Sequence, residues 1–133
     1  MIYLSKKEIA RLVVHAKSSF PAEACGILAG SSGRVEEVFE MTNVHNSGES
    51  FFMDPEEQFK VAKEVRARGM EILAIYHSHV SSSAYPSSED VDMAYDPRIS
   101  YVIISLTNSD RPSIRSFKIN GNSITEEEVV LKE

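Results

Sequence analysis

Three segments of the chain have the polar and apolar pattern of helices. In the first, Ser5 and Glu8 have the spacing of a capping box, and the apolar residues that follow fall on one helix face: Ile9, Leu12, Val13 and Ala16. In the second, Asp54 is a good N-cap and Pro55 suits the first helical position. The helices are predicted to begin at Ser5, at Asp54 and at about Ser87; the second ends near Arg68, before Gly69, and the third ends at the "DPR" of 96–98.

Apolar runs between these helices predict strands. The expected strands cover 2–4, 24–30, 34–44, 71–79, 99–107, 113–119 and 123–131. A Ser-Ser-Gly turn joins the second to the third, and the "NGN" of 120–122 joins the last two as a hairpin. The run at 71–79 is continuously apolar before its histidines, which is typical of a strand covered on both sheet faces. The order β-α-β-β-α-β-α-β-β-β predicts an α/β fold with a mixed β-sheet flanked by helices.

Composition narrows the class of protein. The 133 residues correspond to one domain, 1–133, with 42% hydrophobic and 26% charged residues. The net charge of −6 argues against nucleic-acid binding. We expect a cytoplasmic location and no membrane segment, because there is no apolar run of about 20 residues, no signal peptide and a single cysteine.

Two histidines end the apolar strand at 71–79. Residues i and i+2 of a strand point to the same face, so His77 and His79 present two imidazoles side by side. Such a pair can give zinc two nitrogen ligands. The alternative is a pair of surface histidines without a metal.

Ser87 and Asp90 follow the histidines and also permit two interpretations. The Ser-x-x-Asp spacing is that of a helix cap, which alone explains both residues. If the seven-residue loop 80–86 folds back, however, Asp90 can supply a third ligand. Two imidazoles and one carboxylate leave the fourth zinc position open, as in catalytic sites. Glu23, at the start of the strand "EACGIL", is then a candidate base, or else an ordinary strand-edge carboxylate.

These residues resemble a known motif. "PAEACGIL" at 21–28, then His77-Ser-His79, seven residues, Ser87, two residues and Asp90, is similar to the JAMM motif of MPN-type metalloproteases. The resemblance covers nearly the whole chain and implies a cytidine-deaminase-like JAB/MPN fold with a zinc-dependent peptidase or isopeptidase site. It implies that His77, His79 and Asp90 bind Zn²⁺, that Glu23 is the general acid/base and that Ser87 stabilises the oxyanion.

The short connections resemble those of compact bacterial members of the family. That resemblance implies a ubiquitin-like sulfur-carrier protein as substrate, cut after its C-terminal Gly-Gly tail. The expected groove walls are 46–53 and 80–86, although Phe51, Phe52 and Met53 are more simply explained as core. The family commonly has proline where this chain has Val80, a difference that affects loop shape and substrate preference. The sequence does not decide between a monomer and a homodimer.

The alternative to an enzyme is a non-catalytic MPN-type scaffold. Such scaffolds have generally lost ligand residues, whereas all five motif positions are present here. A zinc nucleoside deaminase is excluded, because Cys25 has no partner cysteine for the required Pro-Cys-x-x-Cys pair. We assign Cys25 and His15 to packing and His45 to a turn, outside the site.

Overall fold

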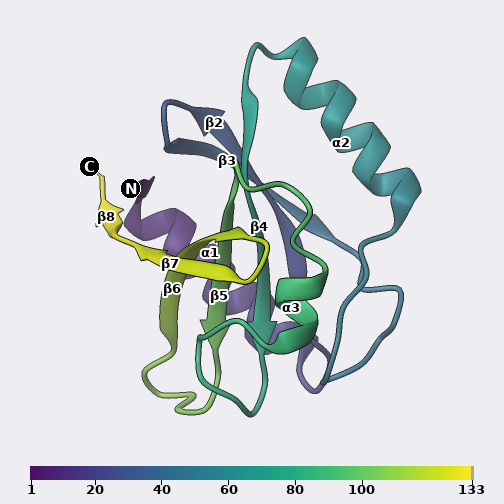
Figure 1. Ribbon diagram of the computed structural model, residues 1–133, viewed down its shortest axis with the longest axis vertical. Helices are drawn as coiled ribbons and strands as arrows, with labels where there is room; N and C mark the ends of the chain where they lie inside the picture. Colours follow the sequence, from purple (N-terminus) through teal and green to yellow (C-terminus); the bar gives the residue numbers. More distant parts are fainter. Residues whose placement is uncertain (133) are drawn as a thin grey trace.

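In the computed structural model, which describes residues 1–132, one mixed sheet of eight strands lies between three helices (Figure 1). The strand order across the sheet is β7-β6-β5-β4-β2-β3-β1-β8. The elements are β1 (Ile2–Leu4), α1 (Lys6–Ser19), β2 (Cys25–Ser31), β3 (Arg34–Met41), α2 (Pro55–Ala67), β4 (Glu71–His79), α3 (Ser88–Asp92), β5 (Ser100–Ser105), β6 (Ser113–Asn120), β7 (Ser123–Glu127) and β8 (Val129–Leu131). The α/β class and the mixed, helix-flanked sheet are therefore confirmed.

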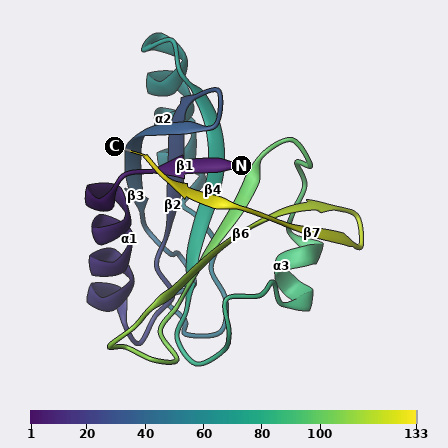
Figure 2. The same cartoon turned by 90° about the vertical axis from the view of Figure 1, so that its left-hand side faces the viewer.

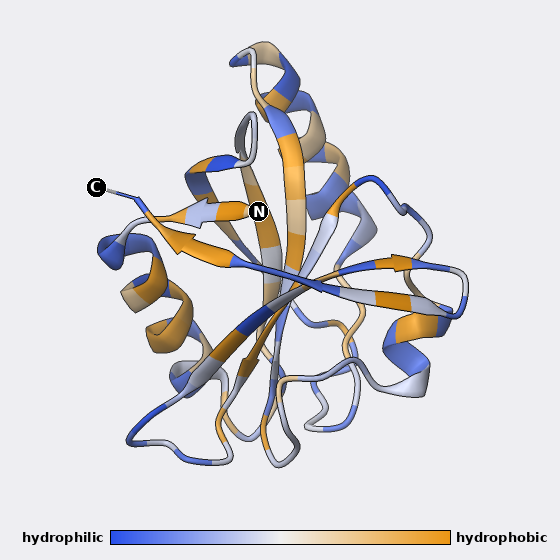
Figure 3. Ribbon diagram, turned by 60° about the vertical axis from the view of Figure 1, so that its left-hand side comes forward, coloured by the Kyte–Doolittle hydropathy of each residue, from blue (hydrophilic) through white to orange (hydrophobic). Residues whose placement is uncertain are grey.

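Helix α1 covers one face of the sheet and α3 lies on the other (Figure 2). Helix α2 packs on the same face as α3. Leu12 and Ala16 of α1 pack with the largest buried cluster, which includes Tyr76. On the opposite face, two smaller clusters pack against Val61 of α2 and Val91 of α3. In Figure 3 the central strands carry long hydrophobic stretches, whereas the loops are mostly polar. The strands in the middle of the sheet are thus covered on both faces, as their continuous apolar runs predict.

Strand β4 is central to the site because its two neighbours run in different directions. It pairs antiparallel with β2 and parallel with β5, with Cys25 opposite His77 on one side and Ile103 opposite His77 on the other. Parallel strands require a crossover connection, and the segment between β4 and β5 contains α3. The crossover therefore begins at the end of β4 that carries the histidines.

The expected strand at 123–131 differs from the observed one. The chain breaks at Glu128 into β7, which pairs with β6, and β8, which pairs in parallel with β1 at the opposite edge of the sheet. The Ile2 amide donates to the Glu128 carbonyl at 3.1 Å. One extended segment thus links both edges (Figure 2). Its sequence pattern predicts only an extended backbone. Tertiary contacts decide that the pairing strand changes from β6 to β1 within this segment.

Three other expected elements extend past the observed ends, among them the strand at 99–107, because β5 ends at Ser105. Helix α3 ends at Asp92, with Met93 as its C-cap. The later part of the expected helix is held in a different conformation, because Pro97 disfavours helical backbone at Asp96 and the Tyr101 hydroxyl bonds the backbone N–H and carbonyl of Asp96 at 3.2 and 3.1 Å. Strand β3 ends at Met41, after which the following amide donates to a carboxylate of α2 instead of to a strand. Among residues 1–132, no helix has the length and apolar character needed to span a membrane.

Candidate metal centre and active site

The end of β4 presents two buried imidazoles on the face that α2 and α3 cover. His77 and His79 are 2% and 4% exposed, and they alternate with Ser78, whose hydroxyl points to the other face and accepts the Ala24 amide at 2.8 Å. The period-two prediction is therefore confirmed. Burying two imidazoles costs solvation, so their nitrogens require partners.

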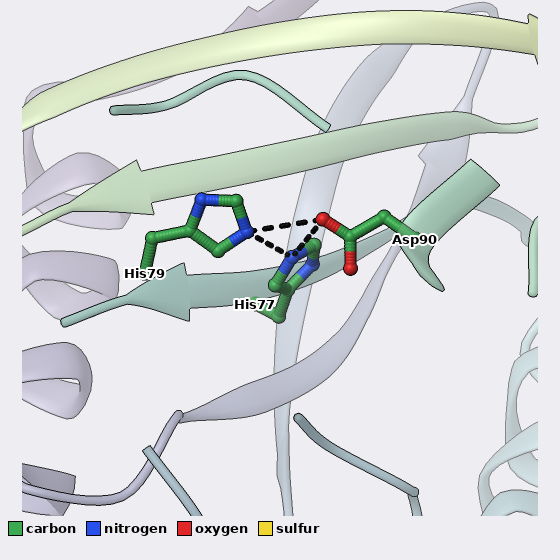
Figure 4. A group of neighbouring side chains, drawn as sticks. All are labelled: His77, His79 and Asp90. Carbon is green, nitrogen blue, oxygen red and sulfur yellow. Dashed lines mark hydrogen bonds and ion pairs between the residues drawn. The ribbon is translucent and has the colours of Figure 1, made fainter. Parts of the chain in front are cut away.

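Asp90 supplies the partner for both rings. Its Oδ2 lies 3.2 Å from His77 Nε2 and 3.0 Å from His79 Nε2, and the two Nε2 atoms are 3.1 Å apart (Figure 4). Asp90 also completes a capping box, because its Oδ2 accepts the Ser87 amide at 2.9 Å while the Ser87 hydroxyl accepts the Asp90 amide at 3.1 Å. The Ser-x-x-Asp sequence is thus a helix cap, and the same cap holds the Asp90 carboxylate toward the two histidines.

The spacing of these three atoms fits a small cation. Ligand atoms about 2.0–2.1 Å from a tetrahedral zinc are about 3.3 Å from one another, and the three observed separations are 3.0–3.2 Å. The three side chains are also the group in the described chain whose donor atoms lie close enough together to hold a metal ion. Two neutral imidazoles and a carboxylate are a donor set that zinc favours.

The neighbouring structure fixes which ring nitrogens face the carboxylate. His79 Nδ1 lies 2.7 Å from the Ser83 carbonyl, so this nitrogen is a donor, and in the neutral ring Nε2 keeps its lone pair toward the cluster. The loop that carries Ser83 is anchored by the Ser105 hydroxyl, which donates to the Ser82 carbonyl at 2.6 Å. His77 is held differently, by stacking on Phe51 with ring centroids 4.5 Å apart, and its buried Nδ1 has no hydrogen-bond partner within residues 1–132.

Charge within the cluster is strongly coupled. Burial favours the neutral form of Asp90, but the two imidazoles outweigh it and hold the pKa of this carboxyl well below its ordinary value. Burial lowers the pKa of His77. Burial also opposes the charged form of His79, yet the Asp90 carboxylate and the Ser83 carbonyl raise its pKa. The cluster therefore keeps an ionised carboxylate next to ring nitrogens, which is the arrangement that attracts a cation.

Glu23 lies beside this cluster at the entrance to β2. The register that pairs Cys25 with His77 places Glu23 opposite His79 when continued by two residues. Its side chain is nearly buried, at 5% exposure, and burial raises its pKa to about 8. His79 lowers the pKa of Glu23 and Asp90 raises it, but by less than burial does. The structure thus brings a protonatable carboxyl to the same face as the three donors, without a direct hydrogen bond between them in the described chain.

With this geometry established, the comparison with protein families is decisive. A family model described as prokaryotic homologs of the JAB domain matches residues 5–120. The chain belongs to this prokaryotic JAB family. The JAMM/MPN resemblance predicted from the motif is therefore confirmed.

Relatives of this JAB protein include named peptidases. The CysO-cysteine peptidase of Mycobacterium tuberculosis is 39% identical over 120 residues, which cover 89% of this chain and 82% of that protein. A desampylase of Pyrococcus furiosus is 31% identical over 122 residues, 92% of this chain and 85% of that protein. These relatives support a hydrolase.

Solved structures confirm the fold. A solution structure from Desulfitobacterium hafniense has a TM-score of 0.91 and 42% identity, covering 100% of this chain and 94% of that one. A JAB1/MPN domain protein from Archaeoglobus fulgidus has a TM-score of 0.65 and 24% identity, covering 98% and 99%. The JAB/MPN fold expected from the sequence is thus present.

The other residues that the sequence placed at the candidate site lie in different surroundings. Ser87 is exposed at the start of α3, and its hydroxyl accepts the Asp90 amide, which leaves its O–H available to donate. Of the expected groove walls, Phe51 stacks on His77, whereas Met53 is core at 5% exposure. Val80 lies next to Gly48, where an added Cβ would meet the Pro21 carbonyl and the Val80 side chain, so the loop after the histidines lies beside the loop at 46–50.

The residues assigned to packing or turns lie outside the cluster. His15 Nδ1 bonds the Tyr76 hydroxyl at 2.7 Å on the α1 face. His45 is exposed and its Nδ1 lies 2.9 Å from the Ser50 hydroxyl. Cys25 is fully buried, and burial raises the pKa of its thiol to about 12, which excludes a reactive thiolate at neutral pH.

Asn43 was not identified from the sequence, yet it connects the two sides of the site. Its amide nitrogen donates to the carbonyls of Glu23 and Ser50, both at 3.1 Å, and reaches the Ser47 carbonyl at 3.5 Å. Its side-chain oxygen accepts the Phe52 amide at 3.1 Å. Asn43 therefore ties the backbone of the candidate base to the loop that stacks Phe51 on His77. A lone asparagine at a strand end gives no sequence signal for this role.

Proposed function

We propose that this JAB protein is a zinc-dependent peptidase that hydrolyses the bond after the C-terminal Gly-Gly tail of a ubiquitin-like sulfur-carrier protein. The observation that carries the proposal is the convergence of His77 Nε2, His79 Nε2 and Asp90 Oδ2 within 3.2 Å of one another, beside a buried carboxyl. A scaffold that binds partners has no need to bury two histidines beside a half-buried carboxylate, because such burial costs stability.

His77, His79 and Asp90 would hold the zinc. When bound there, zinc supplies a Lewis acid that polarises a carbonyl and makes a water molecule more acidic. The chain contributes the orientation of its donors: the Ser83 carbonyl directs His79, stacking on Phe51 directs His77, and the helix cap directs the carboxylate. Fixed donors require no reorganisation during the reaction.

Glu23 would take the proton from the attacking water and deliver it to the leaving amine. General acid/base catalysis is most efficient when the pKa of the group is close to the working pH, and burial brings the pKa of Glu23 to about 8. Ser87 would donate its free O–H to the oxygen that gains negative charge in the tetrahedral intermediate. Its position at the cap of α3 keeps this hydroxyl beside Asp90.

The substrate class rests on the relatives. One is named for CysO-cysteine, and a Thermus thermophilus relative, 34% identical over 104 residues, is named as a probable TtuB-protein conjugate cleaving protease. The first name joins CysO to cysteine, and the second refers to a conjugate of TtuB with a protein. A tail ending in two glycines suits a narrow approach to buried donors, because glycine has no side chain to clash there.

The test uses a ubiquitin-like carrier protein whose Gly-Gly tail is extended by one cysteine. We expect intact mass spectrometry to show loss of the cysteine with zinc-loaded protein and no loss after chelation. Glu23→Gln should lower the rate by about 10²–10⁴-fold, the usual contribution of an acid/base group. The matched variant Glu36→Gln, at an exposed carboxylate on β3, should cleave normally.

Two results would count against the proposal. Full activity of Glu23→Gln would exclude this residue as the acid/base. Absence of zinc, against an expected content of about one ion per chain, together with no cleavage, would favour a non-catalytic scaffold.

A further inference from the structure

An apolar pocket of about 150 Å³ adjoins the three donors and is not used by the proposed chemistry. Phe51 and Phe52 line it from the loop before α2, and Met93 and Tyr95 line it from the segment after α3. Ile75, Ile103 and Ile119 contribute further apolar surface from the sheet, and His77 and Asp90 belong to both the pocket and the donor cluster. The pocket is therefore continuous with the candidate active site.

The pocket extends along β4 in the direction away from Glu23. It contacts Ile75 and His77, whereas Glu23 lies opposite His79 in the continued register. In the proposed function, on which this inference rests, Glu23 gives its proton to the leaving amine. The amine therefore leaves on the Glu23 side, and the acyl part of the substrate lies on the side of the pocket.

The distance along the strand indicates which substrate residue reaches the pocket. Ile75 and His77 are two residues apart, which corresponds to about 7 Å of extended backbone. Because both edges of β4 are paired, an extended substrate tail would lie over this face of the sheet, and along the direction of β4 it would advance by the same two residues from the residue at the scissile bond. The third residue before the cut, which precedes the two glycines, is then the one beside the pocket.

The lining defines the chemistry of the side chain that fits. A volume of about 150 Å³ has room for a group the size of benzene. Within the described chain, the lining includes Glu89 and Asp90 but no lysine or arginine, so it disfavours an acidic side chain. We propose that this pocket is a specificity subsite for an apolar side chain, such as leucine, methionine or phenylalanine, at the third residue before the scissile bond.

The experiment measures binding rather than hydrolysis. Zinc-loaded ¹⁵N-labelled full-length protein is titrated with two hexapeptides that end in Leu-Gly-Gly or Asp-Gly-Gly with a free carboxylate, and Kd is obtained from NMR shifts. Burial of a leucine side chain predicts at least about tenfold tighter binding of the leucine peptide. The shifts should include the amides of Phe52 and Met93.

A charge variant makes the test specific. Met93 is 41% exposed, so Met93→Lys should fold. The added cation should weaken binding of the leucine peptide and strengthen binding of the aspartate peptide, which reverses the preference. The matched control is Val14→Lys at a 65% exposed position on α1, which should bind both peptides as the wild type does. If Met93→Lys fails to fold or to retain zinc, Tyr95→Lys, at a 78% exposed position, repeats the test.

The proposed subsite would be overturned if the two peptides bound the wild type with equal affinity. It would also be overturned if neither peptide showed saturable binding. An unchanged preference in a folded, zinc-loaded lysine variant would also overturn it. These outcomes are separate from failure of the proposed function, because the peptides are not cleaved. Selective binding without cleavage of the carrier protein would retain the subsite and reject the hydrolase.

Discussion

Replacing Glu23 by glutamine should remove a large pH dependence from the stability of the metal-free protein. Burial raises the pKa of Glu23 from 4.5 to about 8. At about 1.36 kcal/mol per pKa unit, this shift corresponds to roughly 5 kcal/mol of stability. Because the folded-state pKa lies above the unfolded one, this contribution is fully present below pH 4.5 and is lost as the pH rises through about 8. Glutamine has no such proton to lose.

The assay is urea unfolding followed by circular dichroism, with chelator present, between about pH 5.5 and 7.5. Over this range the free energy of unfolding of the wild type should fall, relative to Glu23→Gln, by roughly 2–3 kcal/mol. The exposed-site variant Glu36→Gln should follow the wild type. Parallel curves for wild type and Glu23→Gln would refute the reasoning, because they would mean that Glu23 titrates alike in the folded and unfolded states.

Three further predictions concern the surrounding residues. Ser87→Ala should lower the hydrolysis rate by roughly 10²–10³-fold in steady-state kinetics and the free energy of unfolding by only about 1 kcal/mol, from the lost cap; a normal rate would exclude the oxyanion role. Asp90→Asn should weaken zinc binding by at least about tenfold in a competition titration, because it removes the anionic donor; unchanged affinity would place the metal elsewhere. Asn43→Ala should destabilise the protein by about 2 kcal/mol in urea unfolding, since it leaves the Glu23 and Ser50 carbonyls without their donor. A change below about 0.5 kcal/mol would show that the loop does not depend on this side chain.

The local chemistry of the site was predictable because its signals are short in sequence. A strand period of two places His77 and His79 on one face, and the cap spacing of Ser87 and Asp90 begins a helix. Both features are present in the structure. What the spacing alone left open was whether Asp90 faces the histidines, since a helix cap is satisfied in either orientation. The crossover from β4 to β5 decides this, because it returns α3 over the strand end.

Features that depend on distant segments could not be predicted. The pattern at 123–131 predicts extended backbone but not that β7 and β8 pair with opposite edges of the sheet. Asn43 organises the loop before α2 through its side-chain amide, a group that every asparagine has. Its importance comes from the Glu23 and Ser50 carbonyls, which the fold brings within hydrogen-bonding distance. The sequence by itself thus determined the local geometry of the two histidines and of the helix cap, and the order of the elements, because periodicity and capping act within a few residues. Only the tertiary structure decided how the donors converge, how deeply Glu23 is buried and where the apolar pocket lies, because packing brings together groups that are far apart in the chain.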